Sequence, residues 1–151
     1  MSSYISELIN DKTIIGACIG ATFSLIGALV AYFLNLRLER IKLIKDKKES
    51  LFNYNQSLLI IIAEINSYDR RFSSDISSLA KSLENKKNEA KSNIKLMTNL
   101  YFKRLDKEFS TAFFEIDSIF EYVKLNRNPG IEAFSSAIGK LTNLSDKILK
   151  I

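Results

Sequence analysis

The longest apolar run in the chain lies near its N-terminus, where positions 14–34 contain no charged residue. As a helix rising about 1.5 Å per residue, this run would be about 31 Å long, which matches the hydrocarbon core of a bilayer. We therefore expect one transmembrane helix over 14–34, preceded by a short extracytoplasmic segment, 1–13. A buried helix of a soluble domain would need a larger chain around it. A cleaved signal peptide would need a basic leader, whereas this leader carries Glu7, Asp11 and Lys12.

Beyond the apolar run, hydrophobic residues recur every three or four positions, which is the period of an amphipathic helix. A basic juxtamembrane helix is expected over 35–50 and a helical bundle over 51–151. Three apolar stripes define the bundle, and they run from Leu51 to Leu83, from Ile94 to Val123 and from Ile131 to Ile148. The predicted fold class is therefore all-α, with a single N-terminal transmembrane helix followed by a cytoplasmic antiparallel bundle of about three helices.

Two polar stretches separate the three stripes. The first, 81–93, is expected to form an exposed turn. The second, at 126–130, contains the single proline of the chain and predicts a break between helices. There Asn128 is expected to cap the next helix, with Pro129 in its first position and Glu132 near its positive end.

The charges that flank the apolar run predict the orientation of the chain. The leader is slightly acidic, whereas six cations follow the run, and these are Arg37, Arg40, Lys42, Lys45, Lys47 and Lys48. The positive-inside rule then places the C-terminal tail in the cytoplasm and the N-terminus outside. The same cations are expected to contact anionic lipid headgroups, at about 1 kcal/mol each near the surface. The abundance of Lys, Asn and Ile suggests a bacterial protein, and hence the inner membrane.

Small residues recur along the apolar run at the spacing of one helical face. They are Gly16, Gly20, Ser24, Gly27 and Ala31. Small side chains let two transmembrane helices approach closely, and that packing drives their association. We therefore expect a homo-oligomer, although Gly and Ala are also common in membrane helices for other reasons. The hydroxyls of Thr22 and Ser24 are expected to bond back to their own helix.

The second apolar stripe carries aromatic residues on more than one face. Either they form a thick core, or some of them lie at an interface between subunits, where aromatic side chains supply contact area. Phe114, about 100° round the helix from Phe113, is the candidate for that interface. Charge is also uneven, because 81–107 has eight basic residues against three acidic ones, whereas 108–123 has four acids and no base. Solvated helix faces, pairing between subunits and nucleic-acid contact would each account for this pattern.

The composition argues against an enzyme. The chain has no His, a single Cys at position 18 and only five Gly. The usual general base, Ser-His and Cys-His pairs, zinc sites and Gly-rich phosphate loops are therefore not expected. Two Ser-x-x-Lys spacings lack the other motifs of serine acyl-enzymes. We expect no catalytic residues, no metal and no cofactor.

Two non-enzymatic functions follow from this layout. The first is an oligomeric membrane protein that perturbs permeability or forms a pore when triggered. The second is a membrane-tethered adaptor that holds a cytosolic protein partner near the bilayer. In architecture alone, the chain is similar to small single-pass effector or accessory proteins of bacterial antiviral and toxin systems, and this similarity transfers no residues. Nucleic-acid binding is not favoured, because no known motif for it is present.

Overall fold

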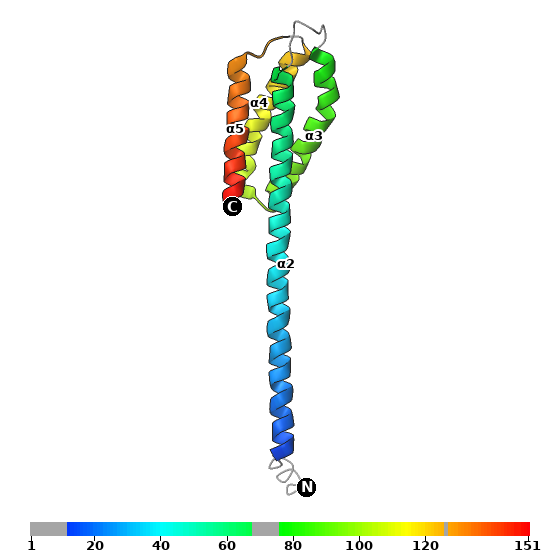
Figure 1. Ribbon diagram of the computed structural model, residues 1–151, viewed down its shortest axis with the longest axis vertical. Coiled ribbons are helices and arrows are strands. Elements are labelled where there is room, and N and C mark those ends of the chain that lie inside the picture. The colour runs from blue at the N-terminus through cyan, green and yellow to red at the C-terminus, as the bar shows by residue number, and fades with distance from the viewer. Residues whose placement is uncertain (1–11, 68–75, 126) are drawn as a thin grey trace. The chain divides into compact units, whose positions relative to one another are not determined.

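The computed structural model describes residues 12–67, 76–125 and 127–151, and these residues are helical apart from short connections. The helices are α2 (Lys12–Ser67), α3 (Ile76–Leu100), the 3₁₀ helix η1 (Lys103–Leu105), α4 (Asp106–Lys124) and α5 (Ile131–Lys150) (Figure 1). No strand occurs within the described ranges, so the all-helical prediction is confirmed. The chain divides into two compact units at Leu43 and Ile44.

The N-terminal unit contains the apolar part of α2. Every side chain described from Thr13 to Leu43 is exposed, including all those of the apolar run 14–34. The hydroxyl of Thr22 donates to the carbonyl oxygen of Cys18 at 2.7 Å, as predicted for a hydroxyl in an apolar helix. By length and composition this is the one helix among the described residues able to cross a membrane.

The unit Ile44–Ile151 is a helical bundle. Figure 1 shows that its consecutive helices run in opposite directions, beginning with the C-terminal part of α2 and ending with α5. One hydrophobic core joins all four helices, and its largest fully buried members are Phe109, Phe120, Leu51, Leu58, Ile62, Ile65, Ile94, Ile116, Ile119, Leu141, Leu144 and Ile148. The described bundle thus contains four helices, one more than the sequence pattern predicts.

The first difference is at 81–93, which lies within α3 and forms no turn. Leu83, Lys87, Ala90 and Ile94 are all buried on the inner face of this helix. The prediction was wrong because Lys87 and Ala90 occupy inner positions of the helix, so the spacing of large apolar residues is interrupted there. The sequence also predicts one continuous stripe from Leu51 to Leu83, part of which, 68–75, lies outside the described residues.

The second difference is a break within the predicted helix 94–123. The backbone amides of Tyr101 and Phe102 both donate to the carbonyl of Met97, which ends α3. Phe102 and Leu105 are buried in the core and hold the connection in place. No Gly or Pro marks this turn, so its position depends on packing and was missed.

The predicted break near 126–130 is confirmed, since α4 ends at Lys124 and α5 begins at Ile131. The predicted capping is wrong in detail. The cap of α5 is Gly130, which adopts a positive φ of 84°, and the Asn128 side chain accepts a hydrogen bond from the Gly130 amide at 3.1 Å. Glu132 lies in the first turn, as expected for an acid at the positive end of a helix.

Candidate membrane and assembly surfaces

The small-residue stripe lies on α2 with nothing packed against it. Gly16, Gly20, Ser24, Gly27 and Ala31 are all exposed, and at about 100° per residue they fall within an arc of about 80°. A Cβ atom added to any of the three glycines would meet no atom within 4 Å. The face is therefore open to a second helix, and its role in association stays a prediction.

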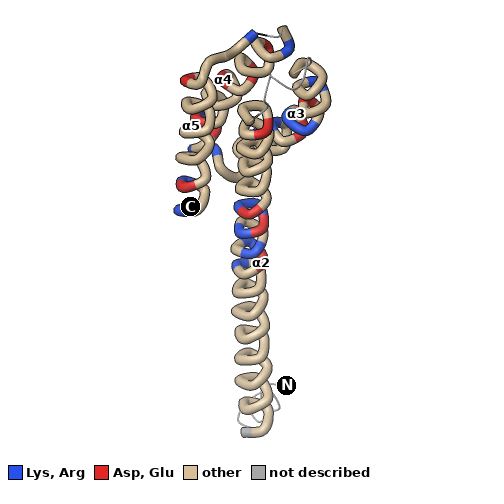
Figure 2. The backbone as a smooth tube through the Cα atoms, turned by 45° about the horizontal axis from the view of Figure 1, so that its top comes forward, with Lys and Arg blue, Asp and Glu red and all other residues tan. Residues whose placement is uncertain are grey.

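The six cations after the apolar run do not share one environment. Figure 2 shows them as a band on α2 that follows a stretch without charged residues. The side chains of Arg37, Arg40, Lys42 and Lys45 are exposed, whereas Lys47 and Lys48 are partly buried. The Nζ atom of Lys48 donates to the carbonyl oxygen of Leu149 at 2.9 Å, so this cation joins α2 to the end of α5. That second role was not evident from the sequence.

Phe114 lies outside the core, although the sequence left open whether the aromatic residues of this stripe form a thick core or an interface. Its side chain on α4 is 75% exposed, whereas its neighbour Phe113 is partly buried and its ring centroid lies 5.8 Å from that of Phe109. A shallow depression beside Phe114 is lined by Lys91, Lys95 and Asp117 as well as Phe113. The two adjacent rings therefore have different surroundings, which permits Phe114 to contact another molecule.

The acidic segment 108–123 finds its cationic partners within one bundle. On α3, the Nζ atom of Lys87 lies 3.1 Å from Oδ1 of Asp117 and 4.4 Å above the centroid of the Phe120 ring, although Lys87 is only 5% exposed. Lys91 pairs with the other oxygen of Asp117. Burial opposes the charge on Asp117, but the hydrogen bonds from Lys91 and Lys87 outweigh it and lower the pKa of that carboxyl.

Further ion pairs link α4 to its neighbours. Lys124 lies 2.5 Å from Glu84 on α3, and this hydrogen bond lowers the pKa of Glu84 and raises that of Lys124. On the other side, α5 supplies partners for two acids of α4, in the pairs Lys140–Glu115 and Lys147–Glu108. Pairing within the bundle therefore accounts for these acids without a second subunit.

One buried polar residue connects α2 to α5. The side-chain amide of Asn55 donates to the Leu141 carbonyl and to the Ser145 hydroxyl, both at 2.8 Å. Its own oxygen has no hydrogen-bond partner among the residues that the structure describes. Such a contact at an inner position favours one alignment of the two helices. Sequence analysis missed Asn55 because it is a polar residue within an apolar stripe.

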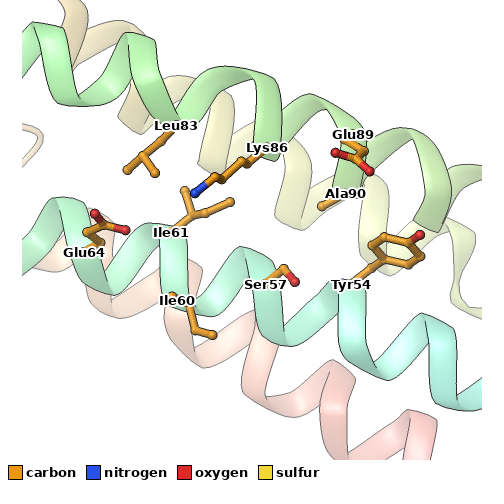
Figure 3. A pocket seen from close by; sticks show the side chains of 9 residues that line it. All are labelled: Tyr54, Ser57, Ile60, Ile61, Glu64, Leu83, Lys86, Glu89 and Ala90. Carbon is orange, nitrogen blue, oxygen red and sulfur yellow. The ribbon is translucent and has the colours of Figure 1, made fainter.

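An open groove lies between α2 and α3 (Figure 3). It has a volume of about 290 Å³, and Ile61, Leu83 and Ala90 contribute its apolar lining. Polar side chains also line it, and these are Tyr54, Ser57, Glu64, Lys86 and Glu89. The groove is mixed in charge, with one cation, Lys86, and two carboxylates, Glu64 and Glu89.

No protein-family model, curated protein or solved structure matches this chain. Within the described ranges, no group of three or more Asp, Glu, Cys or His side chains is placed to hold a metal ion. The single thiol, that of Cys18, is exposed on the apolar part of α2. The candidate sites described above are exposed surfaces of α2 and α4 and one open groove.

Proposed function

We propose that this chain is a single-pass membrane protein in which 14–34 spans the bacterial inner membrane and holds the bundle at the cytoplasmic face. The exposure of the apolar run carries this proposal, since large side chains such as Phe23, Leu25 and Phe33 are 70%, 67% and 65% exposed. Removing one such side chain from water is worth about 1.5–3 kcal/mol, so a run of them requires an apolar environment. A core helix would be mostly buried, which this helix is not.

The second part of the proposal is self-assembly at the membrane. Two uncovered features support it, and they are the face that contains Gly20 and Gly27 and the ring of Phe114. An oligomer of this kind would perturb permeability or form a pore when triggered, as an effector or accessory protein, for example in antiviral defence. No catalytic chemistry is required for that action.

A membrane-tethered adaptor is the second candidate, and the groove between α2 and α3 favours it. The apolar lining around Ile61 and Leu83 suits a hydrophobic side chain of a cytosolic protein, and Lys86 and Glu89 supply polar contacts beside it. In this case, assembly would serve to present several grooves rather than to open the bilayer.

Membrane integration is tested by alkaline extraction of membranes from cells that express the full chain. The wild type should stay in the membrane pellet. The double change Ile26→Arg with Leu29→Arg should release it, because each Arg near the middle of a span costs about 2.5–3.5 kcal/mol. The matched control is Ile26→Leu with Leu29→Ile. Extraction of the wild-type chain by alkali would refute the anchor.

A reporter active only in the cytoplasm, fused after Ile151, tests the orientation of the chain. A silent but well-expressed fusion would place the C-terminus outside and overturn the proposed orientation.

Dye release from liposomes separates the two candidate functions. The pore proposal predicts release by the reconstituted wild type and less release by Gly20→Leu. The adaptor predicts intact vesicles for both. Intact vesicles, together with a cytosolic protein that is retained by the wild type and lost with Ile61→Asp in the groove, would favour the adaptor.

A further inference from the structure

Three chain segments meet at one end of the bundle. They are the beginning of the bundle part of α2, the connection between α3 and α4, and the end of α5 (Figure 1). The hydrogen bond from Lys48 to the Leu149 carbonyl fixes two of them together. We call this end, formed by 44–48, 99–107 and 147–150, the base of the bundle. The base includes Ile44, the first residue of the bundle unit, which follows Leu34 by ten positions in the chain.

The base exposes large apolar side chains. Leu100 is 64% exposed, Leu149 is 60% exposed and Tyr101 is 40% exposed. Tyr101 is an amphipathic ring of the kind that favours the interface between lipid and water.

Cations surround these apolar side chains. Lys103, Arg104, Lys107 and Lys150 are exposed, and none of them forms a salt bridge with a carboxylate of the described residues. The one acid within 99–107, Asp106 at the start of α4, accepts a hydrogen bond from Thr98 at 3.1 Å. Asp46 is the one other acid of the base, against eight Lys or Arg, so the excess positive charge is shared among 44–48, 99–107 and 147–150.

We propose that the base of the bundle is a second membrane-contact surface, which binds the anionic headgroups of the bilayer that its own anchor spans. The combination of exposed aliphatic side chains, a tyrosine and unpaired cations matches the composition of interfacial protein surfaces. Ten helical residues span about 15 Å. The headgroup layer is about 5–7 Å thick on each side, and long lysine and arginine side chains shorten the distance that remains.

This inference rests on the proposed anchor and specifies where the bundle meets the lipid. If both the anchor and the base contact the bilayer, the orientation of the bundle relative to the membrane is restricted. The face that carries Phe114 would then be presented sideways, toward other copies in the same membrane. The anchor alone would leave that orientation free.

The test measures the proximity of the base to lipid in the full chain, reconstituted in vesicles of phosphatidylcholine with and without phosphatidylserine. In a Cys18→Ser background, a fluorophore is attached at Asn99→Cys in the base or at Ser135→Cys in the first turns of α5, both exposed positions. Lipids with a quencher on the headgroup should quench the probe at 99 more than the probe at 135. Phosphatidylserine should increase that difference, and high salt should decrease it.

Removal of charge provides the decisive comparison. Quenching of the Asn99→Cys probe reports the equilibrium constant for contact between the base and the headgroups. Lys103→Gln with Arg104→Gln should lower that constant roughly 25-fold, at about fivefold for each cation. Lys81→Gln with Lys86→Gln removes the same charge from exposed positions elsewhere on α3 and should leave the quenching unchanged.

Vesicle flotation after an alkaline wash, carried out on the same samples, separates the two proposals. Flotation with equal quenching at both probe positions would overturn the base contact and leave the anchor standing. Loss of flotation would overturn both. If the unlabelled Asn99→Cys chain forms disulfide dimers when a mild oxidant is added, and the labelled chain is not quenched, a second copy covers the base, which also overturns lipid contact there.

Discussion

Asn55 on α2 and Ser145 on α5 meet inside the bundle, where the asparagine amide donates to the serine hydroxyl at 2.8 Å. Both residues are buried, and Ser145 also donates to the Leu141 carbonyl at 3.2 Å. The two helices are far apart in sequence, so this small polar network marks their correct alignment within an otherwise apolar core.

A charge at this position should destabilise the bundle strongly. Asn55→Asp would place a carboxylate beside the Leu141 carbonyl, an acceptor that cannot bond to it, and we expect a loss of at least about 3 kcal/mol. Asn53→Asp, at an exposed position of the same helix, should change stability by less than about 0.5 kcal/mol. Chemical unfolding of the full chain in detergent, followed by circular dichroism, measures both. Equal losses would mean that the Asn55 site is open to water.

The sequence was sufficient to predict an all-helical fold and the apolar run, because each depends on a local pattern. The absence of charge over 14–34 is visible without any tertiary contact. The inner positions of Asn55 and Lys87 were not predictable, since each is polar and is buried only because a distant residue satisfies it. The turn at Phe102 was missed for a similar reason, as burial against the core fixes it and no Gly or Pro marks it.

The ion pairs of Asp117 predict a dependence of bundle stability on pH. The folded-state pKa of this carboxyl lies below its ordinary value of 3.8, so its stabilising effect is present above that value and is lost as pH falls through the folded pKa. Asp117→Asn should therefore be less stable than the wild type at neutral pH, and the difference should shrink as acid is added below that value. Unfolding midpoints of both proteins across acidic pH test this. A difference that is constant with pH would assign the effect to packing.

Two phenylalanines of α4, Phe109 and Phe114, provide a test of core against surface. Phe109 is fully buried, and Phe109→Ala should cost about 3–5 kcal/mol, enough to unfold much of a small bundle. Phe114→Ala should leave the unfolding midpoint unchanged and reduce assembly, because its ring is exposed. Sedimentation in detergent measures the second effect. A preserved oligomer in Phe114→Ala would remove this ring from the interface.

The small-residue face of α2 leads to a prediction about assembly within the membrane. A leucine at position 20 would occupy space that is now empty and would hold a neighbouring helix away, so Gly20→Leu should reduce the crosslinked oligomer and Gly20→Leu with Gly27→Leu should reduce it further. Cys18→Leu is the matched control, because position 18 lies on the opposite side of the helix and also gains bulk there.

Crosslinking in native membranes, with equal expression of each variant, gives the comparison. If the double variant and Cys18→Leu both retain the wild-type ladder, the glycine face is not the interface and the helix is an anchor only. If Cys18→Leu alone disrupts the ladder, association uses the opposite face. Loss of the ladder in the glycine variants alone would assign the contact to the face of Gly20, where the backbones can approach most closely.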